Sequence, residues 1–444
     1  MALDTAEATA TAPSLSELAR AAGTEFILAL FVTLSGKPCA KLVPVEAVEL
    51  LAGDGVGFAG YAAGMMGQQP SDPDLVAIPD VRTFTPIPFL RPGLALVHCT
   101  PHVMGKPWPF APRVILERTL EAAAARGFTV NVGAEIEYFL LGRTADGELI
   151  TADIADRSHQ PCYDARDVTR MYDHLTEVST AMNSLGWGNY ASDHEDGNGQ
   201  FEQNFDYADA LTTADRVITA RYLLSMIAEK RGMQATFMPK PFTDRTGTGM
   251  HLHLSLWNGD TPVFPDAADP RGLGLSATAY AFIAGILDHA CALQGVIAPT
   301  VNSYKRIGAT STTSGATWSP RHATYGGNDR THFLRVPDRN RVELRGSDGS
   351  ANPYLAAAAT ISAGLDGIDR ALDPGEPGGK GDRLLPMTLV HAMDAFDADP
   401  VLTAALDIAG PGVAEYFAQR KREEFFAWHN TVSPWEIDHY LTAF

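Results

Sequence analysis

At the centre of this sequence lies the stretch Asp193-His194-Glu195-Asp196-Gly197-Asn198-Gly199-Gln200-Phe201-Glu202. Its core of Asp, Gly and Asn residues forms turns readily and cannot continue a helix. A turn there brings the carboxylates of Glu195 and Glu202 close together with little apolar material to shield them. Carboxylates held close repel one another unless a cation or a proton lies between them. The stretch therefore predicts a turn that presents two acids to a cation.

Three further segments alternate polar and apolar residues, as strands with one buried face do. They are Gly133–Tyr138, Gly249–Leu256 and Arg341–Arg345. A sheet with a solvated face is the commoner cause of this pattern in any single strand. A solvated face needs neither a histidine pair nor matched acids, so the three segments together favour the binding of a ligand or phosphate. The side chains that share a face are Glu135 with Glu137; His251 with His253 and Ser255; and Glu343 with Arg341 and Arg345.

These polar faces carry more negative charge than one cavity can hold without cations. Oxygen ligands with a single imidazole favour Mg²⁺ or Mn²⁺ over Zn²⁺. Neutralising this much charge needs more than one ion, and we expect two or three in one site. The candidate metal ligands are Glu135, Glu137, Glu195, Glu202, His251 and Glu343.

Arginines gather in a later segment that is rich in Ser, Thr and Gly. Their forked guanidinium groups bind carboxylate and phosphate through paired hydrogen bonds. Several arginines beside several metal ions are typical of phosphoryl transfer, although ordinary surface arginines on loops are the alternative. The absence of a GxxxxGK[ST] motif excludes a P-loop enzyme. The cluster comprises Arg306, Arg321, Arg330, Arg335, Arg341 and Arg345.

Composition narrows the class of protein. The chain has 444 residues, of which 45% are hydrophobic, so two to three globular domains are expected. A formal net charge of −19 disfavours nucleic acid or an anionic membrane as partner. The four cysteines form no CxxC pair, which indicates a reducing cytoplasm. No secretory signal and no apolar run of roughly 18 residues is visible, so we expect a cytoplasmic protein.

The order of expected elements divides the chain. Residues 1–13 are predicted to be a disordered tail, and four prolines without periodicity predict a linker over 101–112. Residues 14–100 favour a small β-grasp-like domain. Its expected elements are a capped helix over 14–22, strands over 26–33 and 40–43, a helix over 44–51, and strands near 81–85 and 94–99.

Residues 113–444 are predicted to form a second, larger domain, which makes the fold class α+β. Hairpin turns are expected at Asn258-Gly259 and within 338–340. The expected helices cover 113–126, 167–185, 208–231, 275–296 and 352–372. The expected strands cover 129–141, 234–238, 248–257 and the hairpin of 330–345.

Taken together, the motifs resemble the glutamine synthetase family over nearly the whole chain. They are Gly133–Glu137, His194-Glu195 with Gly199–Glu202, Gly247–His253, Asn302–Arg306, Arg341–Arg345 and Ala351–Tyr354. Within the family, the sequence is most similar to the branch of γ-glutamylmethylamide synthetases, also called glutamate–methylamine ligases. The features typical of that branch are the Asp-His-Glu-Asp motif that begins at Asp193, the loop over 313–320 and the sequence Ser433-Pro434-Trp435-Glu436.

The resemblance implies a β-grasp N-terminal domain and a catalytic domain with a curved antiparallel sheet flanked by helices. It implies a homo-oligomer, commonly a dodecamer of two stacked hexamers, with each active site between neighbouring subunits. It also implies ATP as co-substrate and Mg²⁺ or Mn²⁺ as cofactor. One ion would be held by Glu137, Glu195 and Glu202, and another by Glu135, His251 and Glu343.

The resemblance also assigns substrate contacts, residue by residue. Glutamate would contact Glu137, Thr246, Gly247, Arg306 and Arg345. The nucleotide would contact Tyr207, His253, Ser255, Arg330, Arg335 and Arg341. Arg306, Arg330 and Thr312 would take part in catalysis. In the implied reaction, the γ-carboxylate of glutamate attacks the γ-phosphate of ATP, and an amine then displaces phosphate from the acyl phosphate.

The departures from the family pattern concern the incoming nitrogen. Ala59, which lies two residues before Tyr61, occupies the position of an aspartate at the ammonium site. Thr312 occupies the position of a glutamate in a flap. Thr246 replaces the usual Asn, and the adenylylation segment is replaced by 382–385. Loss of two acids weakens ammonium binding, and Ala59 leaves room for a substituent on nitrogen. The acceptor is therefore predicted to be a primary organic amine, with methylamine or another small alkylamine favoured.

Several alternatives stay open at this point. Glutamine synthesis with an unusual ammonium site is one, and an ethanolamine, polyamine or arylamine acceptor such as aniline is another. A non-catalytic ring that serves as a scaffold or nitrogen sensor is disfavoured, because the expected metal ligands are all present. A phosphagen-type kinase shares the pairing of metals with arginines.

Overall fold

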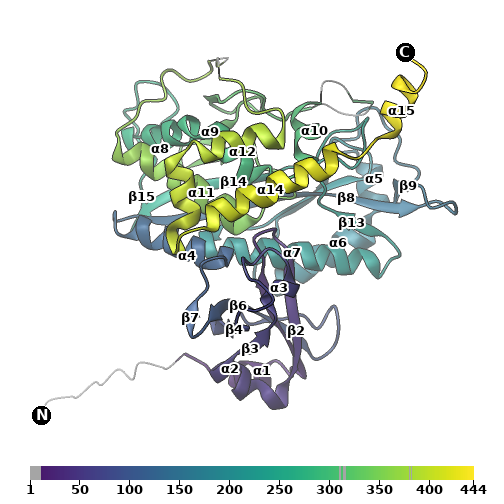
Figure 1. Cartoon of the computed structure of the whole chain (residues 1–444), viewed down its shortest axis with the longest axis vertical. Coiled ribbons are helices and arrows are strands. Elements are labelled where there is room, and N and C mark those ends of the chain that lie inside the picture. Colours follow the sequence, from purple (N-terminus) through teal and green to yellow (C-terminus); the bar gives the residue numbers. More distant parts are fainter. Residues whose placement is uncertain (1–11, 310–311, 314–316, 380, 382) are drawn as a thin grey trace, which may run out of the picture.

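The computed structural model describes residues 12–309, 312–313, 317–379, 381 and 383–444. Residues 1–11 of the expected tail lie outside this part of the chain, as do 310, 311 and 314–316 of the Ser/Thr/Gly-rich segment. The described chain forms a seven-stranded sheet near the N-terminus and an eleven-stranded sheet surrounded by helices (Figure 1). This architecture confirms the α+β class.

The smaller sheet has the strand order β2-β1-β6-β4-β3, and β5 and β7 also pair with β6. β1 runs parallel to β6 and antiparallel to β2, as in a β-grasp-like sheet. Ser14 and Glu17 form the expected capping box at the start of α1. The bounds are α1 Leu15–Ala21, β1 Phe26–Val32, β2 Pro38–Pro44, α2 Val48–Asp54, β3 Val56–Phe58, α3 Gly60–Ala63, β4 Leu75–Pro79, β5 Thr85–Pro86, β6 Leu94–Val103 and β7 Lys106–Pro107.

Two expectations for this sheet are wrong. Residues 81–83 form a 3-10 helix, because the Asp80 side chain accepts a hydrogen bond from the Arg82 backbone N–H and turns the chain. β4, just before that turn, is one of the strands that pair with β6. The expected linker over 101–112 begins inside β6, which continues to Val103 and pairs with β7. The Pro101 carbonyl accepts a hydrogen bond from the Trp108 backbone N–H, which keeps the segment paired on that side.

The larger sheet has the order β10-β11-β8-β14-β18-β17-β16, and all its neighbours along this order are antiparallel except β16 with β17. The strand with the most partners is β8, which pairs with β9, β12 and β13 in addition to β11 and β14. The expected hairpin turn within 338–340 is confirmed. The hairpin expected at Asn258-Gly259 is also present, but its turn residues are Gly259 and Asp260, because Asn258 still pairs with Thr261. The bounds are β8 Thr129–Arg143, β9 Leu149–Thr151, β10 Ala191–His194, β11 Gln200–Asn204, β12 Ala208–Asp209, β13 Gln234–Thr236, β14 Met250–Asn258, β15 Thr261–Pro262, β16 Tyr325–Gly326, β17 Leu334–Asp338 and β18 Arg341–Leu344.

Helices pack against the larger sheet and against one another: α7 lies on β8, and α11 packs against α8 and α4. Two expected helices are each divided. The helix expected over 167–185 breaks at Met171 and that over 275–296 breaks at His289. The His289 ring is hydrogen-bonded to Asp366 and Asp399, which holds the bend. The bounds are α4 Pro112–Ala124, α5 Ala165–Arg170, α6 Tyr172–Ser184, α7 Ala210–Glu229, α8 Ala277–Asp288, α9 Ala290–Ile297, α10 Ser303–Ile307, α11 Pro353–Asp369, α12 Leu389–Asp397, α13 Pro400–Leu406, α14 Val413–His429 and α15 Pro434–Tyr440.

Among the described residues, no single helix is both long and apolar enough to cross a membrane. α8 and α9 meet that criterion only as a pair bent by 75°.

The register of β8 against its neighbours decides which polar side chains meet. Residues that oppose each other across antiparallel strands have Cβ atoms about 5 Å apart, and a slip of one residue would turn them to the other face. The opposed pairs in the larger sheet are Glu137 with Glu202, Glu135 with His251, and His253 with Glu343. The fold thus stacks acids and histidines on one face of β11, β8, β14 and β18.

A buried ionic cluster joins the smaller sheet to the helices of the larger one. Its centre is Arg113 on α4, which lies 2.8 Å from Asp80 beside β4 and 3.1 Å from Asp215 on α7. The Tyr354 hydroxyl donates to Asp215 at 2.6 Å. Burial opposes ionisation of Asp80, but hydrogen bonds from Arg82 and Arg113 lower its pKa to about 2. Removing one partner would leave the others charged and buried.

We therefore expect Arg113→Ala to lower the free energy of unfolding by about 3–5 kcal/mol, because two carboxylates lose their buried counter-ion. Urea denaturation followed by circular dichroism measures this. The matched control is Arg118→Ala on the same helix, whose exposed pair with Glu121 contributes about 1 kcal/mol or less. Equal effects of the two substitutions would contradict the role given to the cluster.

Candidate active site

A cavity of about 590 Å³ opens on the polar face of the larger sheet. Strands β8, β10, β11 and β14, the loop before β14, and α10 each contribute to its wall. The structure brings most of the expected site residues to it. Those on its wall are Glu135, Glu137, Glu195, Glu202, Thr246, Gly247, His251, Arg306, Arg330 and Arg345.

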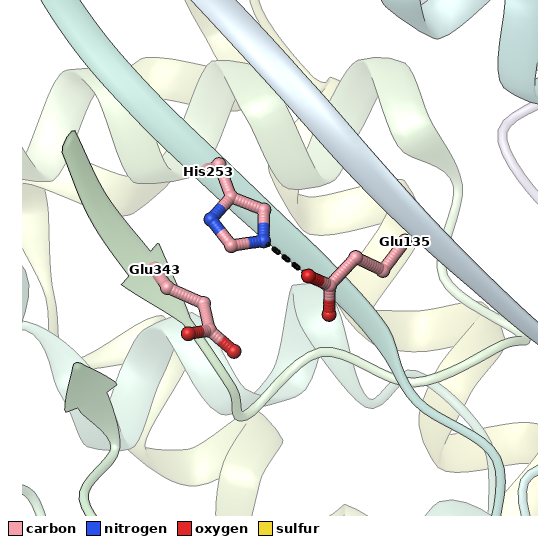
Figure 2. A group of neighbouring side chains, drawn as sticks. All are labelled: Glu135, His253 and Glu343. Carbon is pink, nitrogen blue, oxygen red and sulfur yellow. Dashed lines mark hydrogen bonds and ion pairs between the residues drawn. The ribbon is translucent and has the colours of Figure 1, made fainter. Parts of the chain in front are cut away.

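Glu135 is the centre of the acidic group. Its two carboxylate oxygens are hydrogen-bonded to His251 at 2.9 Å and to His253 at 2.8 Å. Figure 2 shows Glu135 and His253 joined in this way, with the Glu343 carboxylate facing them from the neighbouring strand. His251 also lies 3.7 Å from both Glu137 and Glu343. Three strands thus bring their polar side chains to one point.

Three sets of side chains on this face place their ligand atoms within 4.8 Å of one another, as metal ligands do. The structure departs from expectation in two respects. His253, which was assigned to the nucleotide, is as close to Glu135 and Glu343 as a metal ligand would be. Asp193, which was not assigned, joins Glu195 and Glu202. The sets are Glu135, Glu202 and His251; Glu135, His253 and Glu343; and Asp193, Glu195 and Glu202.

The buried carboxylates on this face repel one another unless cations are bound between them. Burial, together with neighbouring carboxylates, raises the pKa of Glu195 and Glu202 well above the usual range and that of Asp193 to about 6. Burial also opposes ionisation of Glu135, but hydrogen bonds from His251 and His253 hold its pKa well below normal. Buried carboxylates and imidazoles that crowd one another in this way fit divalent cations of the Mg²⁺ or Mn²⁺ type.

The turn between β10 and β11 is held from behind by Asp156. This buried carboxylate accepts hydrogen bonds from the Asn198 side chain at 2.7 Å and the Gly199 backbone N–H at 2.5 Å. It is also hydrogen-bonded to His194 at 2.8 Å. The predicted turn is therefore confirmed, and its flanks are strands. The carboxylate oxygens of Asp156 are already engaged in these hydrogen bonds. We therefore interpret the group of Asp156, His194 and Asp167 as structural support for the turn.

The expected arginines differ in how deeply they are buried and in which carboxylates they contact. Arg306 and Arg345 are buried on the cavity wall, and Arg330 is exposed at its edge. Burial opposes the charge of Arg330, but nearby anionic groups, including Glu343 and Glu135, raise its pKa. Arg345 and Arg335 both pair with Glu343, at 2.5 and 2.8 Å.

Some expected residues do not reach the cavity of this single chain. Arg341 is exposed and pairs with Asp338 at 3.2 Å, outside the wall. The Ser255 hydroxyl accepts a hydrogen bond from the Trp257 indole, away from the cavity. The wall that the structure describes also lacks His253, Arg335, Glu343, Tyr207, Thr312, Ala59 and Tyr61. Ala59 lies between β3 and α3, and Tyr61 lies in α3.

Several residues of the cavity wall were not predicted from the sequence. Asp193 and Asp196 are carboxylates of the wall that the predicted site did not include. Asp193 lies two positions before Glu195, and strand alternation could have revealed it. Tyr163 has a φ of 63°, a conformation that is strained for a tyrosine. Trp318 donates from its indole to Asp196 at 2.6 Å, and only tertiary structure brings these two residues together.

Comparison with known proteins gives a consistent result. The family model described as glutamine synthetase, catalytic domain, matches residues 109–440. The chain is 42% identical to a glutamine synthetase of Rhizobium leguminosarum bv. phaseoli, over 96% of this chain and 98% of that protein. It is 41% identical to a glutamate–methylamine ligase of Methyloversatilis universalis, over 95% and 97%.

Solved structures agree with the sequence comparison. A GmaS–ADP complex superposes with a TM-score of 0.90 at 44% identity, covering 96% of this chain and 99% of the other. GmaS without ligand superposes with a TM-score of 0.89 at 42% identity, covering 97% and 99%. This chain therefore belongs to the glutamine synthetase family.

Proposed function

We propose that this protein is an ATP-dependent ligase that joins the γ-carboxylate of L-glutamate to a small primary organic amine, with methylamine or another small alkylamine favoured. The products would be a γ-glutamylamide, ADP and phosphate. The observation that supports this most is the convergence of five glutamates and two histidines on one face of the larger sheet. Four of these glutamates and His251 line the cavity, together with Arg306, Arg330 and Arg345. Anionic ligands and cationic forks together match a nucleotide triphosphate and a carboxylate substrate.

Two or three Mg²⁺ or Mn²⁺ ions bound at this face would neutralise the phosphates of ATP and the buried acids. Glu137, Glu195 and Glu202 would hold one ion. Glu135, His251 and Glu343 would hold another. His253 is close enough to join this second set, and Asp193 is close enough to join the first.

The chain's own groups then position the reactants. Arg306 and Arg345 would bind the glutamate carboxylate, with Thr246 and Gly247 beside its amino end. The γ-carboxylate oxygen forms a bond to the γ-phosphorus as the bond to ADP breaks, and Arg330 would stabilise the charge on the transferred group. The amine nitrogen then attacks the acyl carbon, and phosphate leaves with the electron pair of the C–O bond.

Selection of the amine rests on Ala59 and Thr312, which replace two acids of the family pattern. The cavity retains Asp193, whose carboxylate can pair with the ammonium form of an amine. Aromatic side chains of Tyr163, Tyr190 and Trp318 on the same wall offer apolar surface to an alkyl substituent. Glutamine synthesis from ammonia is the second candidate, because the Rhizobium relative is named a glutamine synthetase.

We also propose that the active protein is a homo-oligomer, a dodecamer of two stacked hexamers, with the site completed by a neighbouring subunit. Ala59 and Tyr61 lie off the cavity of their own chain, so they could act only at the cavity of another copy. A cytoplasmic location is proposed as well, and the four cysteines, all free thiols, are in keeping with it.

A panel of amines tests the acceptor. With glutamate and ATP, phosphate release is measured across ammonium, methylamine, ethylamine, ethanolamine, isopropylamine and aniline, and products are identified by mass. We expect kcat/KM for methylamine to exceed that for ammonium by roughly tenfold or more, the effect of one methyl group in a fitted apolar pocket. Ammonium as the best acceptor would favour the second candidate.

Restoring an acid should shift the preference towards ammonium. Ala59→Asp is expected to raise the ratio of kcat/KM for ammonium over methylamine by roughly tenfold, because a charged hydrogen bond contributes about 1.5 kcal/mol or more. Ala62→Asp, at an exposed position on the same short helix, is the matched control. Identical ratios in the two variants would refute a role for position 59.

Loss of Arg330 should affect chemistry more than binding. Arg330→Ala is expected to lower kcat by about 10³-fold with a smaller change in the KM for glutamate, as for other arginines that stabilise a transferred phosphoryl group. Steady-state kinetics measure both constants. Arg339→Ala, an exposed arginine in the turn after β17, serves as control, and a wild-type kcat in Arg330→Ala would exclude the assignment.

A further inference from the structure

Gln200, the first residue of β11, is buried between a candidate metal ligand and the candidate glutamate loop. Its side-chain nitrogen donates to the Glu137 carboxylate at 2.9 Å and to the Gly247 carbonyl at 3.1 Å. Its side-chain oxygen accepts the Gly197 backbone N–H at 2.9 Å. Both amide protons and the amide oxygen are therefore engaged, so the side chain has one orientation.

These contacts fix how Glu137 faces the cavity. One of its oxygens, Oε2, accepts from Gln200 and also from the Gly249 backbone N–H at 2.6 Å. The other oxygen, Oε1, points towards His251, 3.7 Å from its Nε2. Because Oε2 is occupied by two donors, Oε1 is the atom left to bind a cation. Hydrogen bonds that orient a ligand in this way tune its metal affinity.

The second contact of Gln200 reaches the substrate side of the cavity. Gly247 is closely packed, since a Cβ at that position would lie 2.5 Å from the Pro239 carbonyl and 2.7 Å from the Arg306 side chain. The backbone of Gly247 is therefore packed directly against the Arg306 side chain. One buried amide thus connects the orientation of Glu137 to the backbone that lines the glutamate pocket.

We propose that Gln200 is a positioning residue that couples cation binding at Glu137 to glutamate binding beside Gly247 and Arg306. This inference rests on the proposed function and goes beyond it, because it assigns cooperativity between metal and glutamate to one side chain. A cation that holds Glu137 in place also holds Gln200 and, through it, the Gly247 carbonyl. Coupling of this kind is reciprocal, so glutamate strengthens cation binding by the same factor.

The same strand supplies a matched control. Gln203 is also buried, but it faces the other way, donating to the Tyr138 hydroxyl at 3.1 Å and accepting from Ser192 at 2.7 Å. It does not line the cavity. A residue that serves only the stability of β11 would behave like Gln203, and a coupling residue would not.

The experiment compares Gln200→Met with Gln203→Met in the full-length protein, using Mn²⁺ as the probe. Calorimetric titration with Mn²⁺ alone counts the sites and their affinities, and titration with glutamate with and without Mn²⁺ gives the coupling factor. In Gln200→Met we expect the Mn²⁺ affinity of one class of site to fall by about 10–100-fold, while the affinity of the other class is unchanged. The loss of a hydrogen bond that orients a metal ligand has an effect of this size. The coupling factor should fall towards one. Gln203→Met should retain both affinities and the coupling.

Gln200→Glu is the second variant if Gln200→Met does not fold, because it keeps the acceptor for Gly197 and loses the donors. Unchanged Mn²⁺ affinities and coupling in a folded Gln200 variant would overturn the inference and leave the proposed function standing. Equal weakening of all Mn²⁺ sites in both Gln200 and Gln203 variants would overturn it as well. Absence of Mn²⁺ binding by the wild-type protein would instead refute the proposed function.

Discussion

Repulsion among buried carboxylates is the constraint on which this structure depends. The antiparallel register of β8 sets Glu137 opposite Glu202, and the turn between β10 and β11 adds Glu195 beside them. Burial removes the water that would screen these charges, so the pKa values of Glu195 and Glu202 rise. The sheet is therefore built around a charge imbalance that bound cations would relieve.

Such an arrangement needs a rigid frame, and buried polar groups provide one. Asp156 holds the turn from behind through three contacts, and the cluster around Arg113 ties the smaller sheet to α4 and α7. Replacing Asp156 or Arg113 alone by an apolar side chain would leave its partners buried without a hydrogen bond or counter-ion, which is costly in a protein interior. The same hydrogen bonds that stabilise the fold thus fix where the acids point.

The cavity also explains how a family built for ammonia could accept a larger nucleophile. Two acids of the family pattern are replaced at Ala59 and Thr312, yet Asp193 and Asp196 keep carboxylates on the wall. A wall that combines the carboxylates of Asp193 and Asp196 with aromatic surface favours a cation with an apolar substituent over a bare one. Because Ala59 lies off the cavity of its own chain, this selectivity would be a property of the assembly.

Local patterns in the sequence determined the α+β class, the capping box at Ser14, both hairpins and the strands that carry Glu135, His251 and Glu343, since strand alternation and turn chemistry act over a few residues. The break at His289 was missed because its partners, Asp366 and Asp399, are distant in the sequence. The strand β4 and the true end of β6 were missed because strand pairing imposes them. Tertiary packing alone decided that His253 joins the acidic group, that Arg341 turns away and that Gln200 bridges Glu137 to Gly247. These contacts depend on strand register and on which segments meet across the cavity, and residues far apart along the chain carry no local signal of that meeting.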